Sequence, residues 1–223
     1  MVELIEGLAS ERVKVNLEDV RAEVARAAAH AGRDPGEVEI LAATKYVRLE
    51  DLPVLAAAGI EVVGENRVQD LKEKVAAHGE MFTWDFIGRL QSKHVKAIVP
   101  CVRYIHSVAS DSALVALERH AEVAAAGLKV LVEVNLAGDP AKAGVAPERL
   151  EDFLSRSKVP VAGLMTMPPR TLDPERSRPW FRRLRELAGT YGLEQLSMGT
   201  TQDFAVAVQE GATIVRLGKQ LYA

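Results

Sequence analysis

The sequence predicts an α/β protein whose parallel strands close into a (β/α)8 barrel. Eight short apolar segments with strand character alternate with helical segments along the chain, and this alternation is typical of βαβ units in a parallel sheet. The length of 223 residues suits a barrel that folds as one unit. Because no Pro/Gly/Ser-rich linker interrupts the chain, we expect residues 1–223 to form one domain. Six strands with misassigned loops would instead fit an open doubly wound sheet, and the pattern alone leaves this alternative open.

The first element is an extra N-terminal helix, expected over residues 1–32 and ended by Gly32 and Pro35. Its apolar residues recur at three- and four-residue steps, as one buried helix face requires: Val13, Leu17, Val20, Val24 and Ala28.

The strands and helices of the barrel follow in order. We expect strands near Glu39–Ala43, Ile60–Val63, Thr83–Ile87, Arg103–Val108, Lys129–Asn135, Val161–Met165, Gln195–Ser197 and Thr213–Leu217. The clearest helices between them are expected at Asp111–Ala126, Pro147–Arg156 and Pro174–Tyr191.

Composition and charge argue against several classes of protein. The formal net charge is −3, so the positive surplus of a general nucleic-acid binder is missing. No apolar run reaches the roughly 20 residues of a membrane helix, and Glu3 and Glu6 do not fit a signal peptide. The only cysteine, Cys101, allows no internal disulfide, which favours the cytoplasm. The five histidines show no metal-ligand spacing, so no metal site is expected.

Lys45 is the first candidate site residue, because the active site of a (β/α)8 barrel lies at the C-terminal ends of its strands. It directly follows the apolar run Ile40–Ala43, so its amine is expected at the mouth of a dry barrel. Desolvation there favours the neutral amine, which condenses with an aldehyde to give a Schiff base. The alternative is an ordinary surface lysine just beyond a strand.

An anion site is expected where the last two strands end, which is the usual phosphate site of such barrels. Gly199 lets the backbone approach a ligand closely. Thr200 and Thr201 are expected to cap a helix whose free N–H groups bind anions. Gly218 offers a second open amide, and Arg216 a fixed positive charge. Simple helix capping and a solvated arginine form the alternative interpretation.

Four further polar residues lie near strand ends. Asn66 and Asn135 are expected to face the mouth, and Glu133 needs a partner if it points inward. His106 is expected to be a buried histidine with satisfied ring nitrogens rather than a ligand. These residues together predict a site with a Schiff-base lysine and a phosphate cradle. Such a site suits pyridoxal 5'-phosphate (PLP), or a sugar phosphate bound by a Schiff-base aldolase.

Six motifs occur in order from about residue 10 to the C-terminus: Ala42–Lys45, Val63–Asn66 followed by Val68–Gln69, Phe86–Gln91, Gly163–Pro168, Ser197–Gly199 with Asp203–Phe204, and Val215–Gly218. Together they resemble the YggS/PROSC family of PLP-binding, or PLP homeostasis, proteins. The resemblance implies a barrel like the N-terminal domain of alanine racemase, with PLP linked to Lys45 and its phosphate held by Gly199–Thr201 and Gly218–Lys219. It also implies Arg216 beside the pyridine nitrogen, where a cation weakens the electron sink that most PLP enzymes use.

The residues at the strand ends of the expected barrel, together with the resemblance, give no catalytic residues. They give these expected cofactor-binding residues: Lys45, Asn66, Ser107, Met198, Gly199, Thr200, Thr201, Arg216, Gly218 and Lys219. Some positions depart from the family pattern. Thr200 and Thr201 stand where Met and Ser are usual, and Asp85 stands where His is usual. Further departures are Ser92–His94 for Ser–Asn–Lys, Ala212 for serine and Ala223 for glycine.

On these grounds we expect a cytoplasmic, non-catalytic carrier that supports vitamin B6 homeostasis, with PLP-dependent apoenzymes as recipients. The alternative is a PLP-dependent amino-acid racemase. Alanine racemase takes a second base, a tyrosine, from a C-terminal domain, and this sequence ends at Ala223 directly after the last strand. A Schiff-base aldolase would need a proton-transfer group beside the lysine, and none is evident. The few aromatic residues leave monomer and weak homodimer open.

Overall fold

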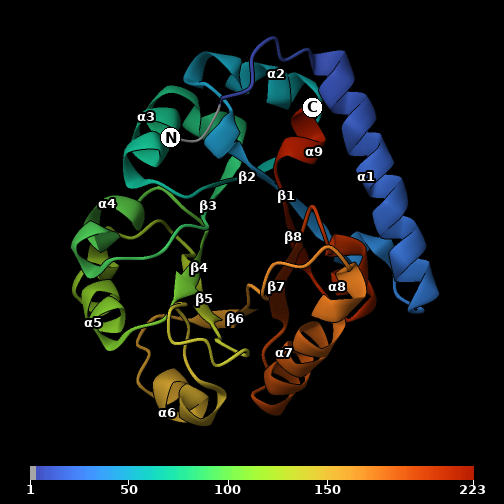
Figure 1. Cartoon of the computed structure of the whole chain (residues 1–223). Helices are drawn as coiled ribbons and strands as arrows, with labels where there is room; N and C mark the ends of the chain where they lie inside the picture. The colour runs from blue at the N-terminus through green and yellow to red at the C-terminus, as the bar shows by residue number, and fades with distance from the viewer. Residues whose placement is uncertain (1–3) are drawn as a thin grey trace.

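The computed structural model describes residues 4–223, whose eight parallel strands form a closed barrel in sequence order (Figure 1). The ring closes between β8 and β1, where Ile40 pairs with Val215 and Leu41 with Arg216. This closure confirms the (β/α)8 prediction and removes the open-sheet alternative. The strands are β1 (Glu39–Ala43), β2 (Val62–Glu65), β3 (Thr83–Phe86), β4 (Tyr104–Val108), β5 (Lys129–Glu133), β6 (Val161–Met165), β7 (Gln195–Thr200) and β8 (Ile214–Leu217).

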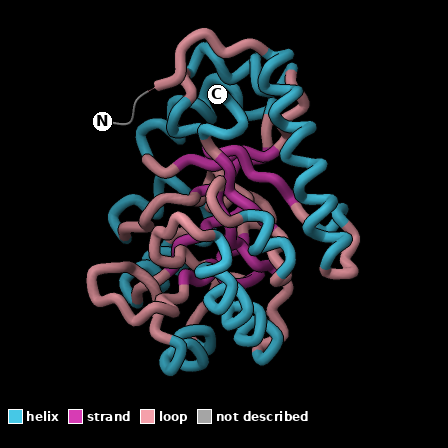
Figure 2. The backbone as a smooth tube through the Cα atoms, turned by 45° about the vertical axis from the view of Figure 1, so that its right-hand side comes forward, coloured by secondary structure: helices cyan, strands magenta, loops and turns pink. Residues whose placement is uncertain are grey.

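The helices surround the ring of strands, as Figures 1 and 2 show. They are α1 (Ser10–His30), α2 (Leu52–Ala57), α3 (Val68–His78), α4 (Val95–Ile98), α5 (Asp111–Arg119), α6 (Leu150–Ser155), α7 (Arg178–Thr190), α8 (Phe204–Gln209) and α9 (Lys219–Tyr222). Asn16 on α1 donates its side-chain amide to the carbonyl oxygens of Leu221 and Ala223. The predicted extra helix is therefore present and secures the last turn of the chain. Among residues 4–223, no helix combines the length and hydropathy needed to cross a membrane.

The N-terminal helix begins later than predicted. It starts at Ser10 rather than at residue 1, and residues 1–3 of the expected helix lie outside the described part of the chain. Gly7 has a positive φ of 69°, which no helix accepts, and the N–H of Ile5 bonds to the carbonyl of Tyr46. The segment before Ser10 is therefore held by the barrel instead of continuing the helix.

Other boundaries also differ, three of them at helix or strand ends that matter here. The helix expected to reach Ala126 ends at Arg119 and is followed by a short 3-10 turn. β2 extends to Glu65 and β7 to Thr200, each beyond the predicted end. Both extensions end on polar residues, Glu65 and Thr200, so the apolar pattern does not mark them.

Apolar side chains pack in two separate places. The larger core fills the space between the strands and the helices. A small cluster of Leu41, Val62 and Ile214 fills part of the barrel interior, with Ile87 and Tyr104 packed against it. The interior also holds buried polar side chains, which the next section describes.

We predict opposite effects of alanine at two glycines. Gly163 on β6 pairs with Gln195 on β7, and a Cβ there would lie 1.8 Å from the carbonyl oxygen of Gln195. Gly163→Ala must move two strands apart, so the free energy of unfolding should fall by about 1–3 kcal/mol. Gly189 on α7 has open space around it, so Gly189→Ala should raise that free energy by about 0.5–1 kcal/mol. Urea denaturation of both variants checks the signs, and equal effects would contradict the packing argument.

Candidate functional site

Lys45 lies where β1 ends, in the 3-10 turn Thr44–Tyr46. A hydrogen bond from the N–H of Val47 to the carbonyl of Thr44 closes this turn. The lysine side chain is half-buried, and its Nζ lies 4.9 Å from the centre of the Tyr46 ring, within cation–π range. The lysine thus stands at the C-terminal end of a barrel strand, with an aromatic ring beside it.

A buried ion pair fixes the turn that carries Lys45. Glu65 is fully buried and accepts hydrogen bonds from Thr44 Oγ1 (2.7 Å) and Lys74 Nζ (2.5 Å). Lys74, from α3, also donates to the carbonyl of Thr44 (2.8 Å). Lys74 is not among the site residues predicted from the sequence. The one sequence feature that could have identified it is its position on the buried face of α3, three residues after Leu71.

Asn66 presents an unsatisfied polar group beside this ion pair. Its backbone N–H bonds to Glu65 Oε2 (3.1 Å), whereas its side-chain Oδ1 is buried without a hydrogen-bond partner within residues 4–223. A buried amide oxygen without a partner costs free energy. Because the two ends of an amide can exchange places, Asn66 can offer either a donor or an acceptor to a bound molecule.

Ser107 and Met198, two predicted cofactor-binding residues, have side chains engaged inside the protein. The buried hydroxyl of Ser107 donates to the carbonyl of Gly88. Met198 is fully buried in the core between strands and helices. Both residues shape the barrel wall. The oxygen of Ser107 can still accept a hydrogen bond from a ligand, and Met198 can offer its backbone.

The end of β7 is a glycine turn packed against α8. Gly199 has a φ of 90°, and a Cβ there would lie 2.6 Å from the Cβ of Ala207. Glycine is therefore required both by the backbone conformation and by the close approach of the helix. Gly199 is buried against α8 and adds no side chain at this strand end.

The prediction that Thr200 and Thr201 cap the following helix is wrong. α8 begins at Phe204, and Asp203 at its N-cap position accepts hydrogen bonds from the N–H (2.8 Å) and the hydroxyl (3.2 Å) of Thr200. Asp203 therefore occupies the Thr200 amide that we expected to bind an anion. Thr201 is exposed, and Asp203 does not bind its hydroxyl as it binds that of Thr200.

The end of β8 lies against the turn that carries Lys45. Gly218 precedes α9, and a Cβ there would lie 2.7 Å from Cε2 of Tyr46. The Nζ of Lys219 lies 5.7 Å from the centre of the same ring. Tyr46 therefore contacts both the lysine of β1 and the glycine end of β8, and two features predicted separately from the sequence meet at one edge of the mouth.

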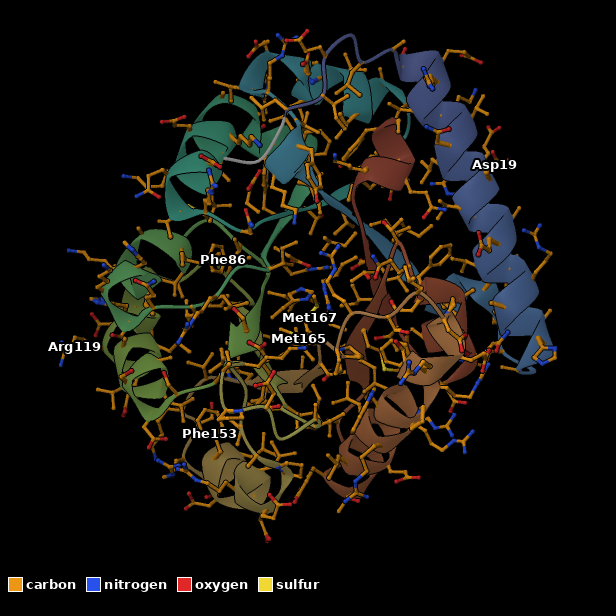
Figure 3. All side chains as sticks on the ribbon, viewed as in Figure 1. Asp19, Phe86, Arg119, Phe153, Met165 and Met167 are labelled. Carbon is orange, nitrogen blue, oxygen red and sulfur yellow. The ribbon has the colours of Figure 1, made fainter. Side chains whose placement is uncertain are left out.

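Arg216 is buried and bonded only to uncharged groups in the described chain. Its Nη1 donates to Ser197 Oγ (2.5 Å), and its Nη2 donates to the Thr166 carbonyl (3.2 Å) and to Met167 Sδ (2.8 Å). Figure 3 places Met165 and Met167 near the middle of the ring. Burial lowers the pKa of Arg216 to about 10, so the guanidinium stays protonated at neutral pH.

A cavity of about 330 Å³ opens beside Arg216 at the ends of β5 and β6. Its wall includes Glu133, Lys142, Thr166, Met167 and Trp180. Burial raises the pKa of Glu133, and the nearby charge of Arg216 opposes this shift. Asn135, which was expected to face the mouth, also lines this cavity, and its amide donates to the carbonyl of Asp139 (2.8 Å) within the following loop.

His106 fills the interior between Ser197 and Asp85. Its Nδ1 lies 2.8 Å from Ser197 Oγ, and its Nε2 lies 3.1 Å from Asp85 Oδ2, which confirms the prediction of a satisfied histidine. Burial lowers the pKa of His106. Burial also raises the pKa of Asp85, but hydrogen bonds from His106 and Arg103 outweigh it and the net shift is downward. At neutral pH the imidazole is therefore neutral and the carboxylate charged.

The described residues hold no metal centre. Across residues 4–223, no three His, Cys, Asp or Glu side chains come together as potential metal ligands. The mouth instead combines a lysine, a buried guanidinium, an unpaired amide and two glycine strand ends, which together suit an organic ligand with an aldehyde and an anionic arm.

Comparison with known proteins points in the same direction. Residues 15–223 match the family model of the alanine racemase N-terminal domain. The chain is 39% identical over 225 residues to the pyridoxal phosphate homeostasis protein of Aquifex aeolicus, across 96% of this chain and 97% of that one. PipY of Synechococcus elongatus PCC7942, with PLP bound, superposes with a TM-score of 0.79 at 30% identity, covering 95% of this chain and 100% of that one. An unknown protein from Bifidobacterium adolescentis superposes with a TM-score of 0.87 at 28% identity, covering 99% and 98%.

We predict that acid destabilises the protein through His106. The unfolded chain binds a proton at this residue near the ordinary pKa of about 6.5, whereas burial lowers the pKa in the folded state. The contribution is thus fully present above about pH 6.5 and is lost as the pH falls below it, with a slope of up to about 1.4 kcal/mol per pH unit. Urea denaturation across this range should show the slope in wild type and in His30→Gln, an exposed control, and a flatter one in His106→Asn. A wild-type stability that does not change below pH 6.5 would contradict a neutral buried imidazole.

Proposed function

This chain belongs to the family of pyridoxal phosphate homeostasis proteins, and on that premise we propose that it carries PLP as a Schiff base on Lys45. One observation carries the proposal: Tyr46 contacts both Lys45 and the backbone at Gly218. An aldehyde with a phosphate arm needs an amine and an anion cradle in one place. PLP is bound in PipY, which is 30% identical over 95% of this chain.

The residues at the mouth match the reactive ends of PLP. The amine of Lys45 condenses with the aldehyde and releases water. The backbone at Gly199 and Gly218 and the hydroxyl of Thr201 hold the phosphate, and Lys219 adds positive charge nearby. Thr200, fixed by Asp203, shapes the turn.

The remaining groups suit the pyridine ring. Asn66 supplies the buried amide that lacks a partner in the described chain. Arg216 supplies a cation at the ring nitrogen, and a guanidinium that stays protonated keeps that nitrogen unprotonated. The ring is then a weak electron sink. This combination favours holding and releasing PLP over carbanion chemistry, so we propose a non-catalytic carrier.

In the cell, such a carrier keeps a reactive aldehyde bound and delivers it to PLP-dependent apoenzymes. A cytoplasmic location agrees with the unpaired thiol of Cys101, and we propose that the protein works as a monomer or weak homodimer. No specific observation favours the racemase alternative. Tyr46 packs against Lys45 itself and against Lys219, which is not the place of a second base facing the lysine across the cofactor.

Lys45→Ala should remove the absorption band of the lysine Schiff base from protein mixed with PLP, while weaker binding through the phosphate persists. Lys142→Ala, at an exposed lysine of the neighbouring cavity, is the matched control and should keep the band. Spectra of wild type and both variants, followed by borohydride reduction and peptide mass mapping, identify the modified residue. A reducible adduct that survives in Lys45→Ala would assign the link to another lysine.

The phosphate site can be tested with a pair of ligands. Thr201→Val removes a hydroxyl from the cradle, and the loss of one hydrogen bond to a charged group should weaken PLP binding about tenfold. Binding of pyridoxal, which lacks the phosphate, should not change. Calorimetric titration of wild type and variant with both ligands measures the difference. Equal weakening for the two ligands would place Thr201 outside the phosphate site.

A further inference from the structure

A continuous chain of hydrogen bonds crosses the barrel interior from Arg216 to Asp85. Arg216 Nη1 lies 2.5 Å from Ser197 Oγ, which lies 2.8 Å from His106 Nδ1. His106 Nε2 lies 3.1 Å from Asp85 Oδ2. The four side chains come from β8, β7, β4 and β3, and none is more than 7% exposed. A polar path thus links the mouth to the centre of the barrel.

The inner end of this path is a fixed negative charge. Asp85 accepts hydrogen bonds from Nε (3.2 Å) and Nη2 (2.8 Å) of Arg103 and from the N–H of Tyr104 (3.1 Å). Arg103 also bonds to both carboxylate oxygens of Glu39, the first residue of β1. Asp85 is therefore held as a carboxylate, which can only accept hydrogen bonds.

The donors along the path have one consistent direction. A guanidinium has no acceptor, so Ser197 Oγ accepts from Arg216. At the other end of the path the carboxylate of Asp85 can only accept, so the ring proton of the neutral His106 sits on Nε2 and points to it. Nδ1 is then unprotonated and accepts the hydroxyl proton of Ser197.

The other protonation states of His106 conflict with its neighbours. A proton on Nδ1 would leave the lone pair of Nε2 facing the carboxylate of Asp85. A doubly protonated ring would place a third positive charge between Arg216 and Arg103. In both cases Nδ1 would donate to Ser197 Oγ, and the hydroxyl proton of Ser197 would lose its acceptor at His106.

We propose that Asp85, His106 and Ser197 are positioning residues that fix Arg216 for the cofactor ring. The charge of Asp85 selects the tautomer of His106, and that tautomer turns the lone pairs of Ser197 toward the guanidinium. The inference rests on the proposed binding of PLP beside Arg216.

The tautomer of His106 can be measured without the cofactor. In protein labelled with 15N-histidine, the signals lost in His106→Asn belong to this ring and should show a protonated Nε2 and a bare Nδ1. Asp85→Asn should switch the ring to the Nδ1–H form, because the new amide gives its oxygen to Arg103 and Tyr104 and its NH2 to Nε2. A proton on Nδ1 in wild type, or an unchanged tautomer in Asp85→Asn, overturns the proposal.

Glu210→Gln is the matched control for this measurement. Glu210 is also a buried carboxylate bonded to arginines, Arg178 and Arg182, but it lies at the end of α8 and outside the path. Its variant should therefore leave the His106 signals unchanged. A switch in this variant too would show that any lost buried charge disturbs the ring, and would overturn the assigned role of Asp85.

Titration with PLP then tests the link to Arg216. Ser197→Ala and Asp85→Asn should each shift the Schiff-base band and weaken PLP binding about fivefold, the effect of one lost net hydrogen bond. Glu210→Gln should change neither readout. An unchanged band and affinity in both path variants overturns the proposal. The two hypotheses fail separately: a wild type without a Schiff-base band refutes the proposed function, while the tautomer measurement still decides the path.

Discussion

The structure depends on the pairing of β1 with β8. Their register, with Ile40 opposite Val215 and Leu41 opposite Arg216, closes the sheet. Closure brings segments from opposite ends of the sequence to one edge of the mouth, where Lys45 follows β1 and Gly218 follows β8. A shift of one residue would turn the side chains of a strand to the wrong face. The contact of Tyr46 with both strand ends exists only because this register is kept.

The second constraint is the polar interior. Parallel barrels are usually filled by branched apolar side chains, but here an apolar cluster fills only part of the space. Buried charges carry a desolvation cost that only complete hydrogen bonding offsets. Both buried networks meet this condition: Glu65 receives bonds from Thr44, Lys74 and Asn66, and Asp85 receives bonds from three neighbouring residues. The Glu65 network holds the turn that carries Lys45, and the Asp85 network holds Arg216. Neither network adds to the apolar core.

The sequence is sufficient to predict the fold and the backbone of the site, because the patterns that predict them lie within short segments of the chain. Strand–helix alternation predicts the barrel, and Lys45 and Gly199 directly follow or end apolar strands. The partners of side chains are harder to predict. Lys74 joins Thr44 across the barrel wall, and no spacing in the sequence marks this contact because it depends on the final packing. Asp203 lies close to Thr200 in the sequence, but the sequence does not show that it takes the amide of Thr200 and begins the helix in place of the threonines.

The seam between β1 and β8 also determines when the barrel can form during synthesis. Its second strand, β8, is the last of the eight strands to be made, and the carbonyls of Leu221 and Ala223 that bind Asn16 come later still. Until then β1 keeps an open edge, and open edges invite pairing with other chains. Contacts between distant parts of a chain also form slowly. The newly made protein therefore passes through a stage in which a nearly complete sheet is open to aggregation, and protection by chaperones matters most in that interval.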